Sequence, residues 1–346
     1  MFPSSPRRNF IKKAAFAGLG IALTDSLLPF SAKASLKFEG KKRIGIIGLD
    51  TSHCVAFAKA LNASDAGPEY GGFKIVAAYP KGSLDIQSSV ERVPGYTADV
   101  IKLGVEIVDS IAALLEKVDF VLLETNDGRL HLEQALQVFK ARKPMFIDKP
   151  ITASLVDAIA IFEAAEKYKS PVFSTSSLRY APTVQEAILG NKVGKVLGAD
   201  AYSPLKIEKT HPDLFWYGIH GVEILFTLMG TGCKEVTRVS APENDVVIGV
   251  WDDNRIGTFR GLHNGKQDYG GTVFGEKMNT PVGPHVGYNP LLLKIVEFFQ
   301  TGIPPVNKKD TLEIVAFMEA ADESKKNNGA SVTIASMFDR AKKNKK

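Results

Sequence analysis

Short apolar strands that alternate with helices place the strongest constraint on what this chain can fold into. Strands are predicted at residues 43–49, 73–79, 119–125 and 145–148. Helices are predicted at 52–61, with Ser52 as the N-cap, and at 131–141, whose apolar side chains share one face. Because helical crossovers join neighbouring strands in parallel, residues 43–150 are expected to form a doubly wound parallel sheet.

After residue 150 a helix is predicted at 154–167 and a strand at 172–176, and beyond them the pattern changes. Strands then follow one another with few helices between them, at 196–202, 236–240, 245–251 and 255–262. One helix is predicted at 220–229, and two more follow at 291–301 and 311–325. This order is typical of an open, mainly antiparallel sheet, so residues 151–340 are predicted as a second, α+β domain. The face of such a sheet suits self-association, and a homo-oligomer is expected.

Paired arginines near the start of the chain, Arg7-Arg8, precede an apolar run at 14–23 and small residues at Ala32-Lys33-Ala34. This order is typical of a cleaved signal peptide, and the apolar run is too short to span a bilayer. Twin arginines indicate the export route for proteins that are already folded. We therefore predict a signal peptide at 1–34, cleaved near Ala34, with the twin-arginine machinery as partner and the periplasm as destination. An ordinary basic, amphipathic arm is the alternative.

The formal net charge of +5 comes mainly from the two ends of the chain. Basic residues gather in the predicted signal peptide and in a basic tail at 341–346, while 35–42 is a polar linker. The body between these ends is balanced in charge, so no partner nucleic acid is expected. The two cysteines, Cys54 and Cys233, fall in different predicted domains and are expected to be separate, buried thiols.

The turn between the first predicted strand and helix lies where a Rossmann-type sheet binds the diphosphate of a dinucleotide. The three glycine positions of the usual G-x-G-x-x-G fingerprint are held here by Gly48, Asp50 and His53. A carboxylate at the second position repels a diphosphate unless it points away or caps the helix. Thr51 and Ser52 offer hydroxyl and backbone N–H groups instead. Cofactor binding and a plain structural turn with Asp50 as the cap both stay open.

An acidic residue that holds the adenosine ribose is expected after the second strand of such a sheet. The segment found there is Tyr79-Pro80-Lys81-Gly82-Ser83, and the first acid is Asp85. Lys81 and Ser83 suit the 2′-phosphate of NADP, which favours NADP over NAD. A plain turn made by proline and glycine is the alternative.

Asp148-Lys149-Pro150 ends a predicted strand at the boundary between the two predicted domains. A residue at the carboxyl end of a parallel strand faces the crevice where this kind of sheet binds ligands. A lysine beside a cationic nicotinamide is suited to move a hydroxyl proton. Lys149 is therefore a candidate acid–base group.

Five segments in chain order resemble those of the glucose–fructose oxidoreductase, inositol dehydrogenase and related (Gfo/Idh/MocA) family. They are Thr125-Asn126 with His131, Asp148-Lys149-Pro150, residues 177–182, residues 218–223, and the segments 298–302 and 319–324. The resemblance covers nearly all of the chain after the predicted signal peptide. It implies a Rossmann-type domain that binds NAD or NADP and a second domain that binds a sugar or polyol. Export to a compartment without free cofactor predicts that the cofactor is tightly bound.

The resemblance also implies that Lys149 and His220 transfer the proton. Members that oxidise polyols usually carry an aspartate four residues before the helix histidine, but this chain has Trp216 there. Tyr217 is then expected to supply a hydroxyl, and Trp216 to stack on a sugar face. The alternative for His220 is a half-buried histidine that caps its helix.

The other predicted site residues fall into two groups. The predicted cofactor contacts are Gly48, Asp50, Thr51, Ser52, His53, Lys81, Ser83, Thr125, Asn126, His131 and Lys149. The predicted substrate contacts are Arg179, Tyr180, His211 and Trp216. No metal ligand is predicted.

The function predicted from these residues is hydride transfer between a nicotinamide cofactor and a sugar, polyol or glycoside hydroxyl. One alternative keeps the cofactor but cleaves a glycoside by transient oxidation and elimination, with no net redox change. A second alternative is a non-catalytic sugar-binding protein on the same scaffold, since Asp50 stands in the phosphate loop. Absence of bound or titratable nicotinamide favours the second alternative.

Overall fold

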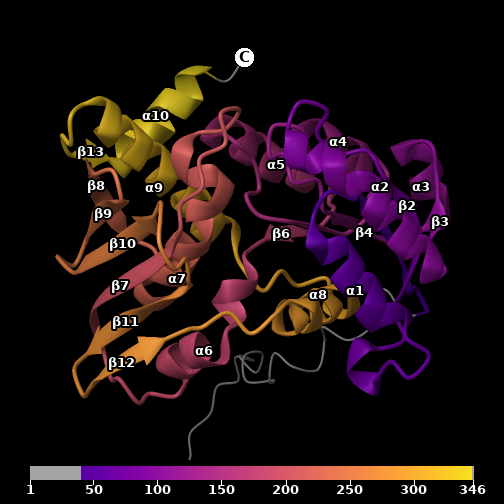
Figure 1. The fold of residues 1–346 in the computed structure, drawn as a ribbon, viewed down its shortest axis with the longest axis horizontal. Helices are drawn as coiled ribbons and strands as arrows, with labels where there is room; N and C mark the ends of the chain where they lie inside the picture. The colour runs from indigo at the N-terminus through magenta and orange to yellow at the C-terminus, as the bar shows by residue number, and fades with distance from the viewer. Residues whose placement is uncertain (1–39, 345–346) are drawn as a thin grey trace, which may run out of the picture. The chain divides into compact units, whose positions relative to one another are not determined.

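The computed structural model describes residues 40–344, which form two β-sheets with helices packed against them (Figure 1). The predicted signal peptide at 1–34, residues 35–39 of the predicted linker and the last two residues of the basic tail lie outside the described residues. The predicted division at residue 150 also stays a prediction.

The first sheet has six strands in the order β3-β2-β1-β4-β5-β6, and all its neighbouring strands are parallel. The strands are β1 (Arg43–Ile47), β2 (Lys74–Tyr79), β3 (Glu106–Ile107), β4 (Phe120–Leu123), β5 (Met145–Ile147) and β6 (Val172–Ser174). Its apolar β-branched strands are buried on both faces, as helical crossovers require. The sheet confirms the doubly wound fold predicted from the sequence.

Helices cover both faces of the first sheet. They are α1 (Ser52–Asn62), α2 (Gln87–Lys102), α3 (Ile111–Lys117), α4 (His131–Lys140) and α5 (Leu155–Tyr168), with a 3₁₀ turn at Pro68–Tyr70. Side chains of α3, α4 and α5 share one buried apolar cluster, and those of α1 and α2 belong to another on the opposite face. The loops after β1, β2, β4 and β5 therefore meet at the carboxyl edge of the sheet.

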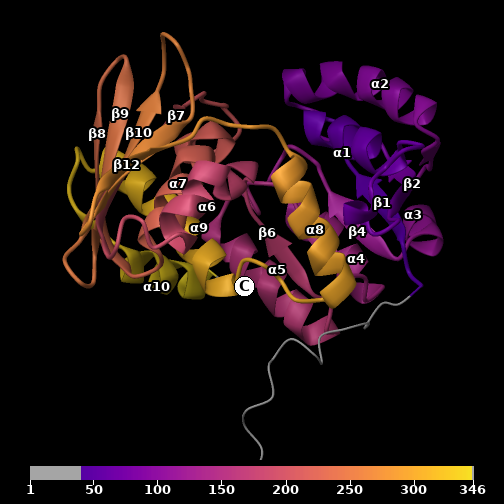
Figure 2. The ribbon, with the colours of Figure 1, turned by 90° about the horizontal axis from the view of Figure 1, so that it is seen from below.

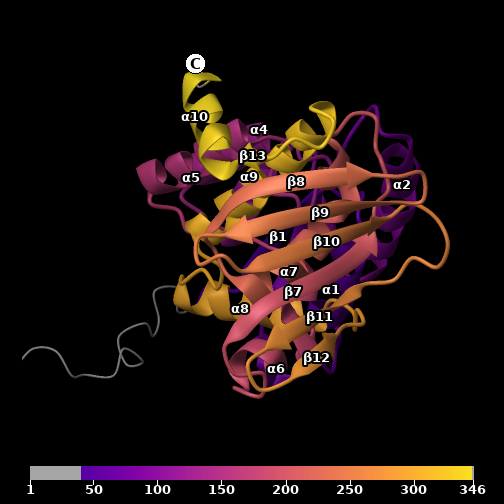
Figure 3. The same ribbon diagram turned by 90° about the vertical axis from the view of Figure 1, so that its left-hand side faces the viewer.

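The second sheet is open and mainly antiparallel, in the order β12-β11-β7-β10-β9-β8-β13 (Figure 3). Among the described strands of this sheet, only β7 and β10 pair in parallel. Its strands are β7 (Val196–Pro204), β8 (Cys233–Ser240), β9 (Asn244–Trp251), β10 (Ile256–Leu262), β11 (Gly270–Gly275), β12 (Asn279–Val282) and β13 (Val332–Thr333). Burial alternates along β9, as expected for a sheet with one covered face.

The helices of the second half are α6 (Pro182–Leu189), α7 (Ile219–Met229), α8 (Asn289–Thr301), α9 (Lys308–Lys326) and α10 (Ile334–Asn344). α7 and α9 pack on the inner face of the second sheet. α8 instead returns to the first sheet beside α1 (Figure 2). There the Phe299 ring stacks on Phe120 of β4 at 4.6 Å between centroids. The chain thus crosses between the two sheets more than once.

The predicted strands and helices are confirmed within one to three residues at their ends. One detail was wrong: Thr51, not Ser52, is the N-cap of α1, and the Ser52 hydroxyl lies 3.1 Å from that of Tyr288. Several helices and strands were not predicted, and α2 is the longest of them. Pro94 and Gly95 lie inside α2 and interrupt the signal that its other residues give.

The two cysteines are separate buried thiols, as predicted. None of the helices in residues 40–344 is long and apolar enough to serve as a transmembrane span.

Candidate active site

Two hollows lie at the carboxyl edge of the first sheet, near the point where the strand order reverses between β1 and β4. Ligands of doubly wound sheets bind at such a point. The first, which we call the β2 groove, has a volume of about 630 Å³ and is lined by Lys81, Ser83, Asp127, Arg129 and neighbouring residues. The second, the central cavity, has a volume of about 160 Å³ and is lined by residues of both halves of the chain.

The loop after β1 packs tightly against the loop after β4. Gly48 has φ +87°, and a Cβ there would lie 2.5 Å from the backbone nitrogen of Thr125. Only glycine fits this position, because it alone tolerates both the left-handed backbone and the close approach. Gly48 thus brings the start of α1 to the end of β4.

Asp50 spans these loops without capping α1. Its carboxylate accepts hydrogen bonds from the backbone N–H of Asn126 (3.0 Å) and of Ser83 (3.3 Å), and α1 has no side-chain cap. The alternative in which Asp50 caps the helix is therefore wrong. Burial raises the pKa of Asp50, while these two N–H groups oppose that shift. The side chain points away from the first turn of α1, whose N–H groups stay free of this carboxylate.

A cluster of charged side chains, which we call the Asp127 clasp, joins three loops beside the β2 groove. Arg129 donates to both oxygens of Asp127 (2.9 and 2.6 Å) and also pairs with Asp85. The Ser83 hydroxyl lies 2.9 Å from Asp127 Oδ2. His211, from the second half of the chain, lies 3.3 Å from Asp127 Oδ1.

Lys149, His220 and Tyr217, the predicted proton-transfer residues, all line the central cavity. Lys149 follows β5 directly and its side chain is almost entirely buried. Tyr217 lies in a π-helical turn, Leu214–Gly218, and His220 in the first turn of α7. The structure thus brings together three residues that are up to 71 positions apart.

His220 forms a hydrogen bond with Ser176, whose hydroxyl lies 2.8 Å from Nδ1. Burial lowers the pKa of His220 well below 6.5, and the positive charge of Lys149 lowers it further. The ring is therefore neutral near pH 7 and can accept a proton. It makes no side-chain cap for α7, so the capping alternative does not describe it.

Aromatic rings line much of the central cavity, and the sequence did not single out three of them. Tyr269 contacts His220 at 5.5 Å between centroids, His285 contacts Tyr269 at 6.0 Å, and Tyr288 contacts His285 at 5.4 Å. Tyr288 also lies 4.2 Å from the ring of His53. These residues lie between β10 and α8 in segments with little periodicity, so no sequence signal identifies them.

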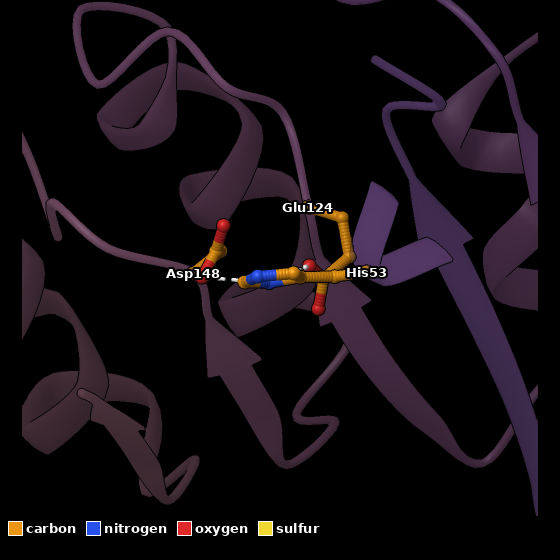
Figure 4. A group of neighbouring side chains, drawn as sticks. All are labelled: His53, Glu124 and Asp148. Carbon is orange, nitrogen blue, oxygen red and sulfur yellow. Dashed lines mark ion pairs between the residues drawn. The ribbon is translucent and has the colours of Figure 1, made fainter. Parts of the chain in front are cut away.

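His53 belongs to a buried cluster with two carboxylates beneath the central cavity. Its Nδ1 atom lies 3.2 Å from Asp148 Oδ1 and 3.5 Å from Glu124 Oε2. Figure 4 shows both carboxylates turned toward the imidazole. Burial lowers the pKa of His53, but Asp148 and Glu124 outweigh burial and raise it. Glu124 follows β4 as Asp148 follows β5, and the sequence did not single it out.

Of the predicted cofactor residues, several line the two hollows. Thr51, Ser52, His53, Asn126 and Lys149 line the central cavity, and Lys81 and Ser83 line the β2 groove. His131 lines neither hollow. Its ring nitrogens lie 2.6 Å from the Thr125 carbonyl and 3.0 Å from the Ile151 carbonyl, so it holds two loops together.

The predicted substrate contacts lie outside the lining of the central cavity. Arg179 donates to Glu223 at 2.5 Å, and Tyr180 is buried in an apolar cluster. Trp216 packs against His211 at 5.0 Å between centroids. Arg179 thus contacts α7, and Trp216 contacts the Asp127 clasp through His211.

Comparison with known proteins identifies a family whose model matches the part of the chain that forms the first sheet. Residues 42–176 match the family model of oxidoreductases with an NAD-binding Rossmann fold, Gfo/Idh/MocA. Residues 42–176 of the chain belong to this oxidoreductase family. The match confirms the family predicted from the sequence, and it makes the chain an oxidoreductase with an NAD-binding Rossmann domain.

Solved structures similar to this Gfo/Idh/MocA chain include three dehydrogenases. A probable dehydrogenase from Thermotoga maritima is 19% identical with a TM-score of 0.69, and myo-inositol 2-dehydrogenase from Lactobacillus plantarum is 15% identical with a TM-score of 0.69. Scyllo-inositol dehydrogenase from Lactobacillus casei, solved with NAD(H) and scyllo-inositol, is 15% identical with a TM-score of 0.68. Each comparison covers 85% of this chain and 99% of the other. At these identities the likeness shows a shared fold. No curated protein sequence matches the chain.

The residues at the sheet edge fit the dinucleotide that this family binds. The β2 groove is large and carries Lys81 and Arg129, and the first turn of α1 is not blocked by Asp50. A Cβ on Gly82 would lie 2.1 Å from Asp50 Oδ2, so Gly82 allows the carboxylate to stay turned aside. Asn126 and Lys149, which line the central cavity, would contact the nicotinamide end of the dinucleotide.

Proposed function

We propose that this chain transfers hydride between NAD(P) and a hydroxyl-bearing carbon of a sugar, polyol or glycoside. The observation that carries the proposal is the meeting of Lys149 and His220 in one small cavity beside the Rossmann sheet. A hydroxyl group loses both a hydride from carbon and a proton from oxygen when it is oxidised. The cavity therefore has to supply a proton acceptor as well as a place for the cofactor.

The β2 groove is proposed to hold the adenosine end of the cofactor, and the start of α1 its diphosphate. The nicotinamide ring, when bound, supplies the hydride acceptor or donor. Lys81 is a cation that suits a 2′-phosphate, whereas Arg129 and the Ser83 hydroxyl already contact Asp127 and Asp85. NADP therefore stays the favoured form, with NAD as the alternative.

Lys149 is proposed to take the hydroxyl proton, with His220 assisting. Both side chains line the cavity, and the neutral ring of His220 accepts a hydrogen bond from a hydroxyl. Ser176 holds the ring in one orientation. Tyr217 contributes a third hydroxyl-binding group at the same wall.

The lining of the cavity supports a polyhydroxylated substrate. Tyrosine hydroxyls and imidazole nitrogens surround it, and each can donate or accept hydrogen bonds as a sugar requires. The scyllo-inositol dehydrogenase that shares this fold binds such a polyol. We extend this substrate class to the present chain as part of the proposal.

Replacing Lys149 tests the proposal. With any sugar or polyol that the enzyme accepts from a panel, Lys149→Ala should lower turnover by about 10²–10⁴-fold, because a positioned acid or base is lost. Cofactor affinity should change far less. Lys59→Ala, an exposed lysine on α1, is the matched control and should leave turnover unchanged. Turnover of Lys149→Ala equal to that of the wild type would overturn the assignment.

Glycoside cleavage through transient oxidation is a second candidate, favoured by the number of acid–base groups in the cavity. His53, His220 and His285 line it together with Lys149. Oxidation of a hydroxyl to a ketone acidifies the neighbouring C–H, and a base that removes this proton allows the glycosidic oxygen to leave as an alcohol. Water then adds to the carbon that lost the alcohol, and the hydride returns to the ketone carbon, so the net reaction is hydrolysis. Product analysis separates the two, since only the dehydrogenase consumes a stoichiometric electron acceptor.

Two further proposals concern the whole protein. The twin-arginine sequence supports export of the folded chain to the periplasm, where no pool of free cofactor is expected, so the cofactor should stay tightly bound. The outer face of the second sheet carries exposed apolar side chains, Tyr202, Val239 and Ile256 among them. It supports a homo-oligomer that forms through this face.

A further inference from the structure

We infer that His53, Glu124 and Asp148 form a site for one first-row divalent transition-metal ion of the Zn²⁺ type. The three side chains come from the start of α1 and from the ends of β4 and β5. Each residue offers one ligand atom, an imidazole nitrogen or a carboxylate oxygen, and these three atoms lie within 4.8 Å of one another. One imidazole and two carboxylates are ligands that Zn²⁺, Mn²⁺ and Fe²⁺ accept.

The polar atoms of this cluster have no hydrogen-bond partners. His53 Nδ1, both oxygens of Glu124 and both oxygens of Asp148 are buried and make no hydrogen bond. Glu124 is 0% exposed, Asp148 1% and His53 6%. Buried carboxylates are costly unless they are paired or bind a metal, so five such atoms in one place need an explanation. One cation at their centre satisfies all three side chains.

The spacing of the ligand atoms matches a metal site. Zn²⁺ lies about 2.0–2.2 Å from nitrogen and oxygen ligands, so neighbouring ligands of a tetrahedral ion are about 3.3 Å apart. His53 Nδ1 is 3.2 Å from Asp148 Oδ1 and 3.5 Å from Glu124 Oε2. The same contacts form ion pairs when His53 is protonated, but the imidazole N–H is not aligned with either oxygen as a hydrogen bond requires.

The electrostatics of the cluster also favour a cation. Two carboxylates face one imidazole, and the nearest additional charge is Lys149 beside Asp148. The two carboxylates therefore attract a cation to the position beside this nitrogen.

One side of the site is open to the central cavity. His53 and Asp148 both line that cavity, while Glu124 is buried beneath them. Zinc sites with three protein ligands and an open position are typical of catalysis, whereas structural sites are closed by four. The fourth position would take water or a hydroxyl or keto oxygen of a ligand in the cavity.

Metal binding to the full-length chain, freed of metal by a chelator and without cofactor or substrate, tests the inference. Calorimetric titration with Zn²⁺ should show one ion per chain, and Co²⁺ should give the visible absorption of a low-symmetry site, which Zn²⁺ then removes. Glu124→Gln and Asp148→Asn keep the side-chain size and should weaken Zn²⁺ binding by more than about 100-fold, because loss of a second-sphere partner alone costs up to that factor.

The control is His263→Gln. His263 Nε2 also lies 3.2 Å from a carboxylate, that of Asp245, but it forms a hydrogen bond with it, and Arg238 pairs with the same carboxylate. Zn²⁺ binding should be unchanged in this variant. Circular dichroism and thermal melting confirm that each variant is folded. A wild-type chain that binds neither Zn²⁺ nor Co²⁺ would overturn the inference, and so would binding that Glu124→Gln leaves intact. Neither result depends on the hydride-transfer proposal, because no cofactor is present.

Discussion

His220 faces a polar cavity but keeps a neutral ring, and that combination decides what it can do. Its pKa is lowered well below 6.5 by burial and by Lys149, while His53, His285 and Asp148 are the other charged or titratable groups that act on it. A neutral imidazole accepts protons, so deprotonation of His220 does not limit the reaction near neutral pH. Any loss of activity that comes from protonating it must occur below pH 6.5.

The pH dependence of kcat/KM checks this role. Between neutral pH and 6.5, kcat/KM should show no acid limb that depends on His220, because the lowered pKa keeps the ring deprotonated. His220→Gln should lower kcat/KM by about 10²-fold. An acid limb at or above pH 6.5 that vanishes in His220→Gln would contradict the account.

Single residues also show where sequence reasoning stops. The position of Asp50 in the phosphate loop was evident from the sequence, but its direction was not. Its partners, the N–H groups of Ser83 and Asn126, are 33 and 76 residues away. Glu124 shows the same limit, since a carboxylate after a buried strand has no meaning until His53 and Asp148 are placed beside it.

Three loops meet in the Asp127 clasp, and this contact stabilises the edge of the site. Burial alone raises the pKa of Asp127, but His211, Arg129 and Ser83 outweigh it and hold the pKa below its ordinary value. Because its pKa is lower in the folded state than in the unfolded state, the carboxylate stabilises the fold fully above pH about 4. This contribution is lost as the pH falls from about 4 toward the folded-state pKa. Asp85 is the other charged group in the clasp.

Asp127→Asn should lower the free energy of unfolding at pH 7 by about 2 kcal/mol, the scale of a charged hydrogen bond. The difference from the wild type should shrink as the pH falls from about 5 to 3. Urea unfolding at a series of pH values measures it. Asp85→Asn is the comparison, because Asp85 is exposed and its pair with Arg129 is expected to contribute little. Equal differences for Asp127→Asn at every pH would contradict the assignment.

The helices and strands differ in how well the sequence predicts them. Buried strands such as β1 and β4 are continuous apolar runs, so their positions follow from composition. α2 and the short strands β11 and β12 carry glycine or proline, which interrupts the pattern. Packing against neighbours, rather than local preference, decides that these segments are ordered.

The central cavity exists only in the whole molecule. Lys149 comes from the first sheet, His220 from α7, and Tyr288 from the segment that leads into α8. α8 then packs on the first sheet, which ties the cavity wall to the Rossmann half. The sequence predicted both halves and the proton-transfer residues of the cavity, but the wall made by residues 269–288 follows from tertiary packing alone.

Cofactor content tests the central claim most directly. Folded protein, purified and then denatured by acid or heat, should release close to one NAD or NADP per chain in an enzymatic cycling assay. Any chain found empty should bind reduced cofactor in a fluorescence titration, and comparison of NADH with NADPH decides which form is preferred. If folded protein neither releases nor binds nicotinamide, hydride transfer is contradicted and a non-catalytic sugar-binding role is favoured.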